Sequence, residues 1–162
     1  MQAGNLEFAA TDPATQFTAA IAQNAAAYLD LPLPQSISAG RTCRARLRSL
    51  AIVSTENTGW EVWLFTRSRT GAETIADTRF LGKYTFTAAS AVRIAAAGLY
   101  YYYIDGIDLP YIVDDVLPSG VPDEDGQRKN LHMALVARES AKAADAAGAV
   151  TVRFVFEPTL GI

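Results

Sequence analysis

The residues of this chain that offer the most chemistry lie in one stretch, Leu99–Asp115, whose sequence is LYYYYIDGIDLPYIVDD. Four consecutive tyrosines lead into a series of aspartates, with Gly106 and Pro110 among them. Tyrosine rings can stack on sugars or anchor a protein interface. Aspartate oxygens can accept hydrogen bonds from sugar hydroxyls or bind calcium. The stretch therefore predicts a binding surface whose ligand class the residues leave open.

The tyrosines predict a β-strand over Leu99–Ile104, because tyrosine is favoured in strands. Successive strand residues point to opposite faces, so Tyr100 and Tyr102 share one face and Tyr101 and Tyr103 share the other. One face can be the core of the domain, and the other needs a neighbour, a ligand or water. We expect Tyr101 and Tyr103 to face a partner.

Charge is segregated along the chain. Arg41, Arg44, Arg46 and Arg48 fall within eight residues, whereas the segment 99–127 contains no basic residue. That segment carries seven acidic residues: Asp105, Asp108, Asp114, Asp115, Asp123, Glu124 and Asp125. Two interpretations stay open. In the first, the acidic loops dock against a basic strand of a neighbour or partner, and in the second, both are solvated surfaces.

The aspartates form an incomplete calcium motif. Asp123-x-Asp125-Gly126 resembles the beginning of a calcium loop, but Lys129 and Leu131 occupy positions that need further oxygen ligands. Other ligands would have to come from a distance, from Asp105, Asp108, Asp114 and Asp115. The sequence therefore predicts no metal site and no cofactor.

The overall charge does not favour nucleic acid as a partner. The chain has 14 basic and 17 acidic residues and a formal net charge of -3, whereas general nucleic-acid binders are usually basic. No stretch approaches the 18 consecutive apolar residues that would indicate a membrane helix, and the first residues do not have the pattern of a secretory signal. We expect neither nucleic acid nor a membrane as a partner.

Catalytic signatures are missing from the sequence. It contains one histidine, His132, and one cysteine, Cys43, in no recognisable catalytic or metal-binding pattern. His132 is predicted to be a buried, hydrogen-bonded strand residue. Cys43 is predicted to be a small strand residue in a reducing compartment, and it has no partner for an intrachain disulfide. The sequence predicts a protein that is not an enzyme, with no catalytic residues.

Length and pattern favour one all-β domain over residues 1–162. A chain of 162 residues can bury roughly 70% of its unfolded surface. Seven or eight short strands, with Pro and Gly between them, predict a single antiparallel β-sandwich. A jelly roll is the leading topology. Leu131–Arg138 and Val150–Glu157 alternate most clearly. One face of the first is expected to hold Leu131, Met133 and Leu135, and one face of the second Val150, Val152, Phe154 and Phe156.

Other strands are predicted from alternation. In Arg44–Ser54, one face is expected to hold Ala45, Leu47, Ala51 and Val53, and the other Arg44, Arg46, Arg48, Leu50 and Ile52. The segment 41–67, with a turn at Glu56–Gly59, is expected to form a hairpin. In Phe80–Thr87, the residues expected to point inward are Phe80, Tyr84 and Phe86.

The N-terminal region has two ambiguous parts. Met1–Asp12 is predicted to be an edge strand or an arm that reaches a neighbour, with Leu6 and Phe8 on one face. For Pro13–Asp30, extended structure is favoured over a helix, although Asp12 and Pro13 together form a good helix start.

Three segments resemble tailed-phage capsid decoration, or cement, proteins of the β-sandwich type. These are SLAIVSTENTGWEVWLF (Ser49–Phe65), LYYYYIDGIDLPY (Leu99–Tyr111) and LHMALVARESAKAADAAGAVTVRFVFEP (Leu131–Pro158). The resemblance implies a non-enzymatic virion protein, present in many copies, that clamps adjacent major capsid subunits. It implies assembly in the host cytoplasm, a place on the outer capsid surface, and a homo-oligomer, with a trimer favoured.

The candidate interface residues that follow from these patterns are Leu6, Phe8, Arg44, Arg46, Arg48, Tyr101, Tyr103, Asp105, Asp108, Asp114 and Asp115. The main alternative function is a glycan-binding β-sandwich module of a phage tail or baseplate appendage. A structural linker elsewhere in a virion is a third possibility.

Overall fold

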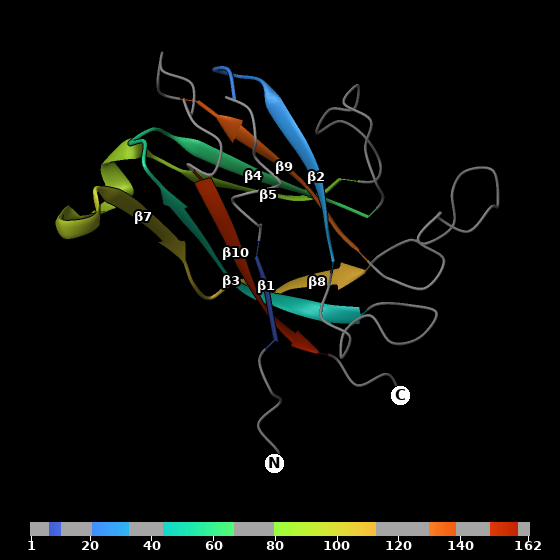
Figure 1. The fold of residues 1–162 in the computed structure, drawn as a ribbon. Coiled ribbons are helices and arrows are strands. Elements are labelled where there is room, and N and C mark those ends of the chain that lie inside the picture. Colours follow the sequence, from blue (N-terminus) through green and yellow to red (C-terminus); the bar gives the residue numbers. More distant parts are fainter. Residues whose placement is uncertain are drawn as a thin grey trace.

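The computed structural model describes residues 7–10, 21–32, 44–66, 80–112, 130–138 and 150–158. Within these ranges the chain forms two antiparallel β-sheets that pack face to face, with two short 3-10 helices (Figure 1). The predicted all-β sandwich is confirmed. The elements are β1 (Glu7–Ala10), β2 (Ala26–Pro32), β3 (Arg44–Ser54), β4 (Trp60–Phe65), β5 (Phe80–Phe86), η1 (Ala88–Ser90), β6 (Val92–Ile94), η2 (Ala95–Ala97), β7 (Leu99–Ile104), β8 (Leu109–Ile112), β9 (Asn130–Ala137) and β10 (Val150–Pro158).

The strand order is that of a jelly roll. The first sheet, called sheet A here, has the order β1-β10-β3-β7-β6, and β8 pairs with the other end of β3. The second sheet, sheet B, has the order β2-β9-β4-β5. The chain passes repeatedly from one sheet to the other, so most sheet neighbours are distant in sequence, as in double-sheet jelly rolls.

The core lies between the two sheets. The residues predicted to share one face of β9, and those predicted to share one face of β10, all belong to the core cluster and are 1% exposed or less, which confirms both alternating patterns. From β4, Trp60, Val62 and Leu64 join the same cluster. The Phe86 ring of β5 meets the Tyr102 ring of β7 edge to face, with centroids 6.1 Å apart, and this contact links the two sheets.

The predicted hairpin over 41–67 is wrong. Strand β3 lies in sheet A and β4 in sheet B, so the chain crosses between the sheets at 55–59. The crossing is tied to sheet A by a hydrogen bond of 3.1 Å from the Thr58 amide to the Tyr102 hydroxyl. A short connection can close a hairpin or bridge two sheets, and the partners of β3 and β4 come from elsewhere in the chain.

A β-bulge in β3 reverses the predicted alternation. Leu47 pairs with Phe156 and Ser49 with Val155, which leaves Arg48 as an extra residue. Four apolar residues on the two sides of this bulge belong to the core: Ala45, Leu47, Leu50 and Ile52. The prediction that Leu50 and Ile52 share a face with the arginines is therefore wrong.

A second irregularity lies in β5. Leu64 pairs with Gly82 and Phe65 with Phe80, so Leu81 is the extra residue. Tyr84 and Phe86 pack in the core as predicted. The prediction for Phe80 is wrong, because the bulge turns its ring to Phe65 on the outer side of sheet B, at 5.9 Å between centroids.

Parts of the N-terminal prediction fall within the described residues. Glu7–Ala10 forms β1, which pairs with β10 at the edge of sheet A. Of the two alternatives predicted for Met1–Asp12, an edge strand or an arm, this part is therefore an edge strand. Ala26–Pro32 is extended and pairs with β9, in line with the extended structure favoured for this region. Residues 1–6 and 11–20 lie outside the described residues.

Candidate interaction surface

Strand β7 sends its tyrosines to two different environments, as predicted. Tyr102 is fully buried, and its hydroxyl accepts from the Thr58 amide and lies 3.1 Å from the side-chain oxygen of Asn57, to which it can donate. Tyr103 points the other way and is 51% exposed. Tyr102 is therefore a core residue, whereas Tyr103 is available to a partner.

The outer side of β6 and β7 carries a group of aliphatic and aromatic side chains, which we call the tyrosine face and define as Val92, Ile94, Tyr101 and Tyr103. Tyr101 is half-buried and the other three are exposed. Val92 lies directly opposite Tyr101 in the β6–β7 ladder, so their side chains share a face. Val92 is 63% exposed and Ile94 is 43% exposed. The Tyr101 and Tyr103 rings stack with centroids 6.1 Å apart and an interplanar angle of 14°. Clustered exposed apolar side chains of this kind mark interaction sites.

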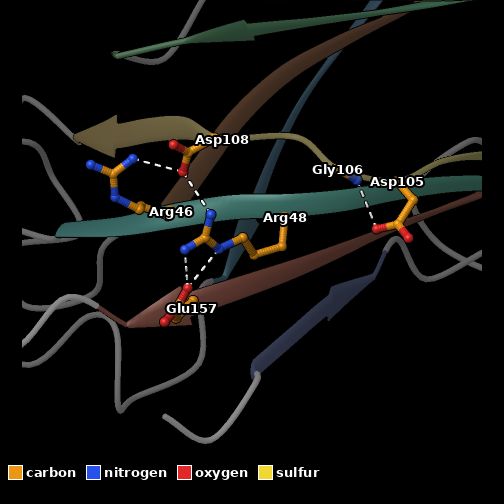
Figure 2. Close-up of polar contacts among 6 residues, drawn as sticks. All are labelled: Arg46, Arg48, Asp105, Gly106, Asp108 and Glu157. Atoms are coloured by element: carbon orange, nitrogen blue, oxygen red, sulfur yellow. Dashed lines mark hydrogen bonds and ion pairs between the residues drawn. The ribbon is translucent and has the colours of Figure 1, made fainter. Parts of the chain in front are cut away.

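A separate group of charged residues, which we call the charge cluster, lies where β3, β8 and β10 meet. It consists of Arg46, Arg48, Asp108 and Glu157 (Figure 2). One carboxylate oxygen of Asp108 accepts from Arg46 at 2.7 Å and from Arg48 at 2.6 Å. The Glu157 carboxylate accepts from Nε of Arg48 at 2.6 Å and also pairs with its Nη2. The two cations and two anions of the cluster balance each other.

The ion pairs shift the ionisation of both partners in the expected direction. The hydrogen bond from Arg46 lowers the pKa of Asp108, with the charges of both arginines adding to the effect. The hydrogen bond to Glu157 raises the pKa of Arg48. These residues are about 36–60% exposed, so the pairs fix geometry more than they add stability.

The bulge in β3 and the segment between β7 and β8 create the charge cluster together. Four residues, 105–108, stand opposite Arg48 and Ser49, because Leu50 pairs with Ile104 and Leu47 with Leu109. The Ile107 amide donates to the Arg48 carbonyl at 3.0 Å, and the Ile107 side chain is buried. Asp108 is thereby held over the arginines, while the Asp105 carboxylate turns away to accept from the Gly106 amide at 2.7 Å (Figure 2).

The outer side of sheet B has a buried carboxylate, Glu61. It is 7% exposed and accepts from Trp63 Nε1 at 3.0 Å and from Arg138 at 2.9 Å, with Lys83 at 3.7 Å. Burial alone raises the pKa of Glu61, but the hydrogen bonds and charges of these neighbours outweigh it, so its pKa is lowered. The Arg138 guanidinium also lies 5.9 Å from the Trp63 ring centroid.

His132 has the environment that the sequence predicted for it. It is 2% exposed, and its Nδ1 lies 2.7 Å from the carboxylate of Asp30, on the neighbouring strand β2. The prediction of a buried, hydrogen-bonded strand histidine is confirmed.

The predicted interface residues are distributed over distinct places. Arg46, Arg48 and Asp108 come together in the charge cluster, whereas Tyr101 and Tyr103 form part of the tyrosine face. Asp105 is exposed at the end of β7. For Phe8 and Arg44 the structure describes the backbone, which pairs with Val155 and Ile112. The remaining predicted residues, Leu6, Asp114 and Asp115, lie outside the described residues.

One interpretation of the charge segregation was that the acidic loops of one molecule dock against the arginine strand of another. Within the described residues, Asp108 and two of the arginines satisfy each other inside one chain, which accounts for part of that charge complementarity without a partner. The role of Asp114 and Asp115 in docking stays a prediction.

Sequence reasoning missed three surface residues: Val92, Ile94 and Arg153. Val92 and Ile94 are two residues apart in a short strand, so they share a face. They are exposed because β6 is the last strand of sheet A. Arg153 stands between buried Val152 and Phe154 and is exposed on the outer side of β10. A single charged residue inside an apolar strand is the signal that could have identified it.

Two further properties bear on the kinds of site present. Among the residues that the structure describes, no three His, Cys, Asp or Glu side chains are grouped to hold a metal ion. The residues that resemble the beginning of a calcium loop, 123–126, lie outside the described ranges. In the same described part of the chain, no helix has the length and apolar character to cross a membrane.

No protein-family model matches the chain, and a search of curated proteins gives no match.

Proposed function

We propose that this chain is a non-enzymatic virion structural protein that decorates and stabilises a phage capsid by bridging neighbouring major capsid subunits. The observation that carries the proposal is the tyrosine face, where exposed Tyr103, Val92 and Ile94 lie together with the half-buried Tyr101, on which the Tyr103 ring stacks. Tyrosine is enriched at the energetic centres of protein interfaces, and exposed apolar surface is stabilised when a partner covers it.

The fold and the sequence resemblance support the same function. Jelly rolls serve as viral capsid domains, although they also serve as lectins, so the fold alone does not choose between these uses. The resemblance of Ser49–Phe65, Leu99–Tyr111 and Leu131–Pro158 to tailed-phage decoration proteins favours the capsid role. A position on the outer capsid surface, assembly in the host cytoplasm and association as a homo-oligomer, with a trimer favoured, are parts of this proposal.

A glycan-binding module of a tail or baseplate appendage is the second candidate. The specific observation in its favour is the stacked pair of Tyr101 and Tyr103, since exposed aromatic rings can also hold sugars. The aliphatic residues Val92 and Ile94 favour a protein partner instead, because they continue the apolar surface without adding a flat ring or a polar group for sugar hydroxyls.

The experiment that tests the proposal is a density-gradient separation of the source material, with this chain quantified in each fraction. The proposal predicts comigration with a large particle at hundreds of copies per particle. Recovery only as a small free protein contradicts it. A low copy number per particle would indicate a structural linker or an appendage instead. Binding of the free protein to cell-surface polysaccharide would favour the glycan-binding module.

A further inference from the structure

Arg153 is an exposed arginine that has no anionic partner among the residues that the structure describes. Among the arginine side chains that the structure describes, Arg46, Arg48 and Arg138 each pair with a carboxylate. Arg153 and Arg93 are exposed and form no such pair. The two carboxylates of the charge cluster, Asp108 and Glu157, pair with Arg46 and Arg48 instead.

The register of sheet A places Arg153 beside the tyrosine face. Arg153 pairs with Ala51, and Ala51 pairs with Tyr103, so the three lie in one row across β10, β3 and β7. Neighbouring strands are about 4.8 Å apart, which puts the backbones of Arg153 and Tyr103 about 10 Å apart on the same side of the sheet. The residue between them in this row, Ala51, has only a methyl side chain.

A protein that covers the tyrosine face must also cover Arg153. A standard interface buries about 800 Å² on each partner, equivalent to a disc of radius about 16 Å, which extends past Arg153 from a centre at Tyr103. Covering a guanidinium removes water from it, and this is unfavourable unless an anion replaces the water. The covering surface therefore needs a negative charge at this point.

We propose that the outer face of sheet A recognises an acidic site on its protein partner, in which an Asp or Glu carboxylate pairs with Arg153 while apolar side chains cover Tyr103 and Val92. The spacing predicts that the carboxylate stands about 10 Å from the apolar group over Tyr103. This inference rests on the proposed function and adds the chemistry of the partner surface, which the exposed apolar residues do not define by themselves.

The test is rebinding of the purified, tagged chain to particles from the source lysate that have been stripped of their own copies. Arg153→Glu places two negative charges together and should lower the apparent affinity about tenfold or more. Arg93→Glu is the matched control. It makes the same charge change at an exposed, unpaired arginine on the opposite face of β6, and should change affinity by about twofold or less.

Salt dependence separates an ion pair from a structural effect. Raising the salt concentration from about 0.05 M to about 0.5 M should weaken binding of the natural chain, because screening acts on exposed charges, and should affect Arg153→Ala much less. Melting temperatures of all variants, measured in the free protein, should be unchanged.

Each outcome decides a different point. Rebinding of Arg153→Glu with natural affinity overturns the inference and leaves the capsid proposal intact. If polygalacturonate, an acidic polysaccharide, competes for binding and Arg153→Glu also loses binding, the ligand of Arg153 is an acidic glycan and the inference of a protein partner is overturned. If the natural chain itself does not rebind, the capsid proposal is contradicted, and so is the inference that a carboxylate of a capsid protein pairs with Arg153.

Discussion

Glu61 and Arg138 show how a single buried carboxylate can be kept ionised at the surface of sheet B. The carboxylate is surrounded by donors from Trp63, Arg138 and Lys83, and these outweigh the unfavourable effect of its burial. Its pKa is therefore lower in the folded chain than in the unfolded chain. A group with a lowered folded-state pKa stabilises the fold above its unfolded pKa, and that stabilisation is lost as the pH falls through the folded value.

Glu61→Gln tests this assignment. At pH 7 the substitution should lower the free energy of unfolding by about 1–2 kcal/mol, because it removes a charge from hydrogen bonds to Arg138 and Trp63. As the pH falls below the pKa of Glu61 in the unfolded chain, the unfolded chain binds the proton first and the stabilisation by the ionised carboxylate declines, so the difference between the two proteins should shrink. Urea denaturation at pH 7 and pH 3 measures both values. An equal difference at the two pH values contradicts the assignment.

The burial and direction of individual side chains were predicted from the sequence more successfully than their interaction partners. The buried state of His132 and the opposite directions of Tyr102 and Tyr103 follow from local pattern, and the structure confirms them. The pairing of Arg46 and Arg48 with Asp108 does not follow from local pattern, because it joins segments about 60 residues apart. Such pairs depend on which strands become neighbours.

At the scale of elements, the departures from regular strands determine where side chains point. The bulge at Arg48 was invisible in the alternation of β3, since one extra residue reverses every later position. The same holds for β5, where the bulge at Leu81 turns Phe80 outward. The assignment of β3 and β4 to one hairpin failed for another reason: a short connection does not reveal whether the chain turns back or crosses between sheets.

Gly106 shapes the segment that joins β7 and β8. It has a φ of 69°, a left-handed conformation that side chains with a Cβ rarely adopt, and no atom lies within 4 Å of an added Cβ. Gly106→Ala should therefore lower the free energy of unfolding by about 1–2 kcal/mol through backbone strain alone. Gly106→Asn should cost less, because asparagine tolerates this conformation better. Denaturation curves of the three proteins test this, and equal stabilities contradict it.

The two sides of β7 should respond differently to substitution. Replacing both Tyr101 and Tyr103 by Ala should weaken assembly on particles while lowering the free energy of unfolding by no more than about 1.5 kcal/mol, the value of an aromatic pair. The matched control is Tyr102→Ala, which removes a fully buried ring and should cost about 3–5 kcal/mol.

Particle binding and urea denaturation, measured on the same preparations, distinguish the two effects. If the double variant loses as much stability as Tyr102→Ala, then Tyr101 and Tyr103 belong to the core and the tyrosine face is not a docking surface.

At the scale of the whole molecule, the sandwich separates stabilising and interacting parts. The inner faces of both sheets form one apolar cluster, and the outer side of sheet A carries the tyrosine face beside the charge cluster. The sequence was sufficient to predict the sandwich, because turn residues and alternating strands are local signals. The strand order agrees with the jelly roll named as the leading topology, but it depends on pairing between distant strands and so is not a local signal. The exposed state of Val92 and Ile94 was not predictable in this way, because it depends on β6 being the last strand of sheet A.

The central claim is that another protein covers the tyrosine face in the assembled particle. Hydroxyl-radical footprinting, with oxidation measured by mass spectrometry, compares the free chain with the chain on particles. The account predicts that Tyr103, Val92 and Ile94, which are exposed in the free chain, become protected on particles. Equal oxidation of these three residues in both states, with protection confined to Trp63 on the outer side of sheet B, would contradict it.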